Sequence, residues 1–110
     1  MANTFKNAFS ASIGTSAVDV YTVPSATTST IIGASVANIE SSAVNVDVTV
    51  TDTSGTITAH LVKGAPVPVG GALVVIGGDQ KVVLEATDKL TVTSDTASSI
   101  DAVISVLEQS

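Results

Sequence analysis

Hydrophobic and polar residues alternate with a period of two along most of this chain. The clearest case is the segment Val44–Thr51, in which four valines alternate with polar residues. This period is typical of a β-strand that turns one face to a core and the other to solvent. β-branched residues fill the segment, as a pleated sheet prefers.

Similar runs recur between turn-forming residues, and no window shows a helical period. Ala72–Ile76 and Val82–Leu84 are apolar at every position, whereas the other runs alternate. Short strands at this spacing predict an all-β fold, a single antiparallel β-sandwich or jelly-roll-like domain of about eight strands over residues 1–110. The alternating strands are predicted at Ala17–Val23, Thr30–Asn38, Val44–Thr51, Thr56–Lys63, Leu90–Thr93 and Ile100–Val106.

Turn residues and the first twelve positions complete this prediction. Asp52–Gly55 is expected to close a hairpin in which Gly55 supplies the positive φ angle. A bend is expected around Pro66–Gly71. Residues 1–12 are predicted to form either a first strand, over Thr4–Ser12, or an N-terminal arm.

The run Ala72–Ile76 has more apolar residues than one core face requires. A strand in a two-layer sandwich has a single core face, so its other face must be covered by a loop or a subunit, or stay exposed. We favour a subunit. The nine candidate contact residues are this run, the bend and the two phenylalanines: Leu73, Val74, Val75, Ile76, Val67, Pro68, Val69, Phe5 and Phe9.

The two phenylalanines have two interpretations. Phe5 and Phe9 are an even number of positions apart and would share one face of a strand. They would either fill the core or anchor an N-terminal arm on a neighbouring subunit by adding a strand.

The charge of the chain limits its partners. Only 13% of the residues are charged, and the net charge is −6, with four lysines and no arginine. This balance argues against nucleic-acid binding and against an anionic membrane surface. So few charges suit a surface that is buried against other subunits, although a monomer coated with Thr and Ser has the same composition.

No catalytic, cofactor or metal site is predicted. The chain has no cysteine and a single histidine, His60, which alternation places on an outward face beside Thr58. Asp79, Glu85 and Asp88 lie close together in sequence but lack the spacing of a calcium loop. We therefore expect no enzyme and no cofactor.

Targeting signals are also absent from the printed sequence. The first sixteen residues lack the apolar core of a signal peptide, and the longest apolar stretch, Ala72–Ile76, is too short to span a bilayer. We expect synthesis in a cytoplasm, with the protein remaining there or leaving inside an assembly.

Nearly the whole chain resembles small virion proteins of tailed phages, particularly marine and cyanobacterial phages. The resemblance lies in a framework of short segments and carries over no catalytic residue. One departure is Thr87-Asp88, where the family often has Gly-Asp. The segments are Met1–Ala8, Val20–Pro24, Leu61–Pro68, Gly77–Glu85 and Val103–Glu108.

The resemblance implies a structural role in a virion. The expected function is a decoration, cement, neck or tail accessory subunit that stabilises the particle through protein–protein contacts. Expected partners are other virion proteins and copies of the chain itself, in a trimer or larger ring. The alternative is an adhesion or receptor-binding module of a tail appendage, against which the scarcity of aromatic residues counts where the receptor is a sugar.

Overall fold

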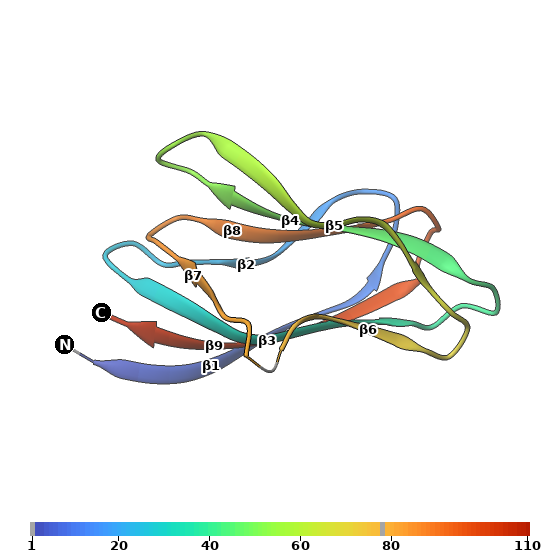
Figure 1. The fold of residues 1–110 in the computed structure, drawn as a ribbon, viewed down its shortest axis with the longest axis horizontal. Helices are drawn as coiled ribbons and strands as arrows, with labels where there is room; N and C mark the ends of the chain where they lie inside the picture. Colours follow the sequence, from blue (N-terminus) through green and yellow to red (C-terminus); the bar gives the residue numbers. More distant parts are fainter. Residues whose placement is uncertain (1, 78) are drawn as a thin grey trace.

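The computed structural model describes residues 2–77 and 79–110 and shows two antiparallel β-sheets packed face to face (Figure 1). The predicted β-sandwich is confirmed. The described residues form nine strands: β1 (Asn3–Ile13), β2 (Val18–Thr22), β3 (Thr28–Asn38), β4 (Val44–Asp52), β5 (Ile57–Val67), β6 (Ala72–Ile76), β7 (Val82–Leu84), β8 (Lys89–Ser94) and β9 (Ile100–Gln109).

The strand order is of the jelly-roll type. The first sheet, here called sheet A, has the order β1-β9-β3-β6, and β7 also pairs with β3. The second, sheet B, has the order β2-β8-β4-β5. Figure 1 shows sheet A below and sheet B above, with the two ends of the chain side by side. Ala2 and Ser110 exchange both of their backbone hydrogen bonds there.

An aliphatic core fills the space between the sheets. Alternate residues of each strand point inward, so period-two runs become core on one side only. Sheet A contributes side chains such as Ile31, Ile104 and Val106, and sheet B contributes Val48 and Val92, all at most 1% exposed. The alternation that predicts the strands therefore also selects the core.

β1 is a full strand of sheet A from Asn3 to Ile13. It pairs with β9 from Asn3 to Ser10 in one continuous register, and an irregularity follows before Ile13. Phe5 and Phe9 are 75% and 66% exposed. They do not fill the core, because they lie at the positions of β1 that point out of the sandwich.

One local prediction about turns was wrong, and another was correct with a later start. The positive φ angle of the β4–β5 hairpin belongs to Thr56, with φ of 54°, and not to Gly55. Gly55 instead lets the Asp52 side chain lie close to the backbone, since a Cβ at residue 55 would lie 2.8 Å from Oδ2 of Asp52. The bend predicted at Pro66–Gly71 is present as a turn from Pro68 to Gly71, closed by a backbone hydrogen bond of 2.9 Å, and it starts after Pro66 because β5 continues to Val67. β5 is an edge strand, where proline is tolerated.

None of the described residues forms a helix, so none provides a helical segment long and apolar enough to cross a membrane.

Candidate functional site

The outer face of sheet A carries two rows of apolar side chains that cross the sheet. Directly paired residues of neighbouring strands share a face, so the register defines each row. The first row runs from β1 to β6 through Phe9, Val103, Ser35 and Val74. The second runs from β1 to β7 through Phe5, Leu107, Thr30 and Val83.

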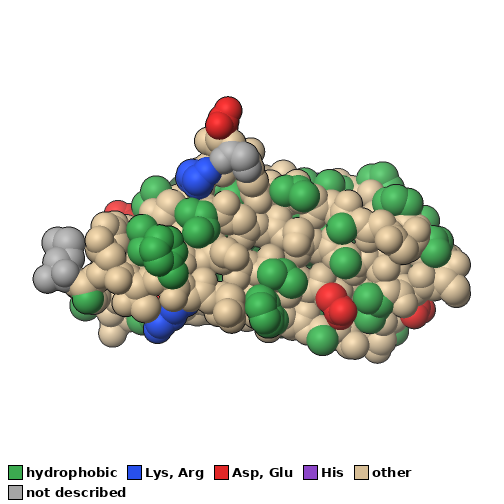
Figure 2. All heavy atoms as spheres, turned by 90° about the horizontal axis from the view of Figure 1, so that it is seen from below, with side chains coloured by type: hydrophobic (Ala, Val, Ile, Leu, Met, Phe, Trp, Pro, Cys, Tyr) green, Lys and Arg blue, Asp and Glu red, His purple; other side chains and the backbone are tan. Residues whose placement is uncertain are grey.

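These rows hold five of the large hydrophobic side chains that are most exposed in the described residues. Phe5, Phe9, Val74, Val83 and Val103 are between 45% and 75% exposed. Figure 2, which looks at this face, shows groups of hydrophobic side chains across it and few charged ones. Exposed apolar side chains gathered on one face in this way are typical of a contact with another protein.

A row of small and polar residues separates the two apolar rows. It contains Asn7, Ser105 and Gly33, which are paired across β1, β9 and β3. Because these side chains are short, a shallow depression of about 340 Å³ forms beside Phe5 and Ile32. The face therefore has two ridges with a trough between them.

Asp101 is the one charged side chain that the described strands direct onto this face. It pairs with Ala37 on the outer side, and its carboxylate accepts a hydrogen bond from the backbone N–H of Ser12 at 2.9 Å. This charge-assisted hydrogen bond stabilises the carboxylate, which keeps its charge. The rest of the face can be dehydrated without burying an ionised group.

The nine predicted contact residues divide into four sets. Phe5, Phe9 and Val74 lie on the outer face of sheet A, and Pro68 and Val69 are exposed in the loop after β5. Leu73 and Val75 are partly buried against the core. The last two, Val67 and Ile76, are core residues at 0% and 1% exposure, so they cannot contact a partner in this conformation.

A β-bulge explains the doubly apolar run Ala72–Ile76. Ala34 pairs with Ile76 and the next residue, Ser35, pairs with Val74, so Val75 is an extra residue on β6. A bulge of this kind shifts the alternation by one position and turns Ile76 to the inside. Of the residues predicted from this run, Val74 therefore remains as the surface residue.

Val83 and Val103 belong to the same surface, although sequence reasoning did not select them. Val103 occupies an outward position of β9, the strand predicted from the alternation of Ile100, Ala102, Ile104 and Val106. The sequence does contain an indication of this surface, since Val103 and Leu107 are apolar at positions where that alternation predicts polar residues. What could not be read from the sequence is that they lie beside Phe9 and Phe5.

A buried polar cluster fixes β1 to the rest of the sandwich. Ser29 Oγ lies 2.5 Å from the hydroxyl of Tyr21, which donates to Oε2 of Glu108 at 2.6 Å. Nζ of Lys6 lies 3.1 Å from Oε1 of the same carboxylate. The cluster joins β1, β2, β3 and β9, so it crosses from one sheet to the other.

Both ionisable members of this cluster have shifted pKa values. Burial, reinforced by the hydrogen bond to Glu108, raises the pKa of Tyr21 to about 12. The hydrogen bond from Tyr21 lowers the pKa of Glu108, and Lys6 adds to this against the opposing effect of burial. Tyr21 is therefore a neutral donor and Glu108 a charged acceptor at neutral pH.

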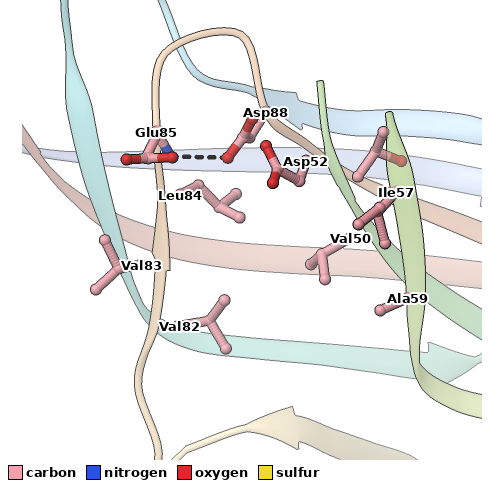
Figure 3. Close-up of a pocket in the computed structure, with 10 residues that line it drawn as sticks. Val50, Asp52, Ile57, Ala59, Val82, Val83, Leu84, Glu85 and Asp88 are labelled. Carbon is pink, nitrogen blue, oxygen red and sulfur yellow. Dashed lines mark hydrogen bonds between the residues drawn. The ribbon is translucent and has the colours of Figure 1, made fainter. Parts of the chain in front are cut away.

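Two of the acidic residues considered above, Glu85 and Asp88, meet Asp52 at a groove between the sheets, whereas Asp79 does not line it. The groove, of about 330 Å³, lies between the β4–β5 hairpin and β7 and is lined by aliphatic side chains such as Val50 and Leu84 (Figure 3). Carboxylate oxygens of Asp52, Glu85 and Asp88 lie within 4.8 Å of one another.

Asp88 has a structural role within this cluster. Its two oxygens accept hydrogen bonds from the backbone N–H groups of Thr53, at 3.0 Å, and Glu85, at 2.9 Å. It therefore joins the β4–β5 hairpin to the turn after β7. His60 does not line the groove but pairs with Thr49 on the outer face of sheet B, as predicted.

Comparisons with known proteins give one similarity, at the level of fold. No protein-family model and no curated protein matches this chain. A solved structure described as "Bacillus endospore appendages form a novel family of disulfide-linked pili" matches with a TM-score of 0.58 and 11% sequence identity. The match covers 99% of this chain and 87% of the other. The shared feature is the all-β sandwich fold, and the resemblance to phage virion proteins stays a prediction.

Proposed function

We propose that this chain is a non-enzymatic structural subunit that acts through contacts with other protein subunits in an extracellular particle or appendage. The observation that carries the proposal is the outer face of sheet A, with two apolar rows and one charged side chain, Asp101, that is hydrogen-bonded to the backbone. Such a face favours burial against another protein over permanent contact with water. In an isolated monomer the apolar rows stay exposed to water and contribute no burial.

The fold neighbour supports the same class of function. That protein is described as belonging to pili, which are polymers of protein subunits. It is also described as disulfide-linked, whereas this chain has no cysteine. Copies of this chain would therefore have to associate through non-covalent contacts, which agrees with a large apolar face.

The setting we propose is a virion, where the chain would be a decoration, cement, neck or tail accessory subunit. This step rests on the resemblance of the framework segments to tailed-phage proteins. A subunit that binds only the assembled particle stabilises the particle by mass action. The chain would then be made in the host cytoplasm and carried out within the particle.

A charge-placement experiment tests the structural role. Val74→Lys places a charge at an exposed edge position of sheet A, and Thr58→Lys places the same charge at an exposed edge position of sheet B. We expect Val74→Lys to weaken association by at least about tenfold in a light-scattering concentration series, because the charge must be dehydrated in the contact. Thr58→Lys should behave as the wild type. Equal behaviour of both variants and the wild type would refute the role of this face.

A labelling experiment tests the setting. An antibody against this chain should mark purified particles in electron micrographs, with many copies over a head for a decoration protein. A single ring at the neck or tail would identify an accessory subunit instead. Label confined to a terminal tip would favour the adhesion module, and unlabelled particles would refute the virion setting.

A further inference from the structure

We propose that β1 pairs with β1 of a second copy, antiparallel and with Asn7 on the two-fold axis, so that sheet A continues from one subunit into the next. This inference rests on the proposed function to the extent that both require contacts between subunits. It adds the partner, the strand and the register.

The first argument is that β1 has an open edge. β1 is the terminal strand of sheet A, and its partner on one side is β9. Ala2 and Ser110 form a doubly hydrogen-bonded pair, and the same register continues to Ser10. In an antiparallel ladder these pairs recur at every second residue, so the backbone groups of the odd-numbered residues point away from β9. These residues are Asn3, Phe5, Asn7 and Phe9.

The second argument is that this edge lacks the usual protection against strand pairing. Edge strands are normally blunted by proline, bulges, short length or a charged side chain, especially lysine. β1 is regular and free of proline between Asn3 and Ser10. Its one lysine, Lys6, is engaged with Glu108 through the ion pair at 3.1 Å.

The other edges are protected in these ways. β5 has the same length as β1, but two register shifts, a positive φ angle of 61° at Gly64 and Pro66 interrupt it. β2 and β6 have five residues each and β7 has three, and the pairings of β2 and β6 contain register shifts. Among the described strands, β1 therefore offers the longest regular edge for pairing.

The third argument is the sequence of the edge itself. Residues 5–9 read Phe-Lys-Asn-Ala-Phe, so the outward side chains are symmetric about Asn7. An antiparallel partner centred on Asn7 places Phe5 opposite Phe9 of the second copy, twice by symmetry. Cross-strand aromatic pairs of this kind stabilise sheets. About six new backbone hydrogen bonds would form over this length.

This register also joins the surface features of the two copies. The row that ends at Phe9 in one copy meets the row that ends at Phe5 in the other, so both apolar rows become continuous across the pair. The troughs meet at the two Asn7 side chains, whose amides can hydrogen bond to each other. Centring the pair one residue earlier would place Lys6 directly opposite Lys6 of the second copy, which is unfavourable.

The experiment uses the absence of cysteine from the wild-type chain. Asn7→Cys should form a disulfide with itself under mild oxidation, because hydrogen-bonded antiparallel neighbours have Cα atoms about 5.5 Å apart, within the disulfide range. Asn45→Cys, an exposed Asn on β4 of the other sheet, is the matched control for random collision. We expect Asn7→Cys to cross-link at least about tenfold faster.

A mixture tests the register, and a proline variant tests the edge. Phe5→Cys mixed with Phe9→Cys should give more mixed dimer than either alone gives homodimer.

Asn7→Pro removes an N–H that points away from β9, so the variant should fold, as shown by circular dichroism, but lose the pairing. If Asn7→Pro fails to fold, the cysteine variants still decide the question.

The outcomes separate this inference from the proposed function. Equal cross-linking of Asn7→Cys and Asn45→Cys, or an unchanged dimer in folded Asn7→Pro, would overturn the β1 pairing. If Val74→Lys still weakens association in that case, the structural function stands and the partner surface lies elsewhere. If Asn7→Cys cross-links fast and Val74→Lys leaves association unchanged, the β1 pairing is supported and the contact is confined to the β1 edge.

Discussion

The two outer faces of this sandwich have the same strand geometry but different chemistry. The outer face of sheet A has apolar rows that end in Phe5 and Phe9. The outer face of sheet B consists largely of threonine, with charged residues among them; Asp19 pairs with Thr91, and Asp47 pairs with Thr93. Threonine satisfies the β-propensity of a strand as valine does, but its hydroxyl group binds water.

The difference shows which residues serve folding and which are available for another purpose. Both sheets bury the same kind of aliphatic core on their inner faces. Sheet B shows that an outer face needs no further apolar residues for a stable strand. The apolar residues on the outer face of sheet A therefore exceed what folding requires, and this excess is the basis for assigning them to subunit contacts.

The largest expected effect separates the inner from the outer face of one strand. Ile104 is 1% exposed and its neighbour Val103 is 45% exposed. Ile104→Ala should lower the free energy of unfolding by about 2–5 kcal/mol, because it leaves a cavity in the core. Val103→Thr should change it by no more than about 0.5 kcal/mol, because it alters only the outer surface.

Both changes in the free energy of unfolding are measured by urea unfolding. The protein concentration is kept low enough that light scattering shows only monomer. The same Val103→Thr variant should associate less than the wild type at higher concentration. A large loss of monomer stability in Val103→Thr would mean that the outer face of sheet A contributes to folding. Its apolar residues could then not be assigned to subunit contacts by comparison with sheet B.

The next effect concerns the cluster that holds β1 in place. Tyr21→Phe removes the donor to Glu108 and leaves a buried carboxylate oxygen without that partner. We expect the free energy of unfolding to fall by about 1–3 kcal/mol. Thr91→Val, which removes an exposed hydrogen bond to Asp19 on the outer face of sheet B, should cost no more than about 0.5 kcal/mol. Urea titrations at pH 7 compare the two, and equal losses would contradict a special role for the cluster.

A smaller effect follows from the lowered pKa of Glu108. A carboxyl group with a folded-state pKa below its unfolded value of 4.5 stabilises the fold above that value. This contribution is lost as the pH falls below 4.5 and through the folded-state pKa. Glu108→Gln should therefore show a weaker decline in stability between pH 5 and pH 3, measured by urea unfolding at about half-unit steps.

Two related measurements define the origin of that pH dependence. Lys6→Met should flatten the decline less than Glu108→Gln, because Tyr21 is the larger cause of the shift and Lys6 a lesser one. At the alkaline end, the raised pKa of Tyr21 stabilises the fold below pH 10, and this contribution is lost between pH 10 and about 12. If Glu108→Gln does not change the decline in stability between pH 5 and pH 3, Glu108 is not its cause.

Local sequence patterns predicted the strands well because each strand's alternation is a property of neighbouring residues. Val44–Thr51 and Ile100–Val106 could be assigned from their own residues, and both lie within observed strands. The bulge at Val75 could not be assigned, since it depends on how β6 pairs with β3. For this reason the predicted contact residue Ile76 proved to be a core residue. Val67 is a core residue because it pairs with the buried Val44 at the end of β5.

The candidate site was harder to predict because its rows are properties of the sheet and not of any strand. Phe5, Leu107 and Val83 come together through pairings between segments far apart in the chain. The sequence could suggest that Phe5 and Phe9 share a face. It could not place Val83 and Val103 beside them, because alternation shows which face a residue lies on but not which distant strand is its neighbour.

The smallest expected effect tests whether apolar content alone produces association. Thr49 and Thr93 are half-buried and point outward from central strands of sheet B. The double variant Thr49→Val with Thr93→Val should change monomer stability by no more than about 0.5 kcal/mol, since both residue types favour strands. We also expect no new association in light scattering, because Asp19, Asp47 and Lys89 still require water on that face. A new oligomer in this variant would mean that any added apolar area suffices. An unchanged mass, with wild-type association weakened by Val74→Lys, would mean that the partner is selected by the arrangement of the apolar rows on a face with one charged side chain, Asp101.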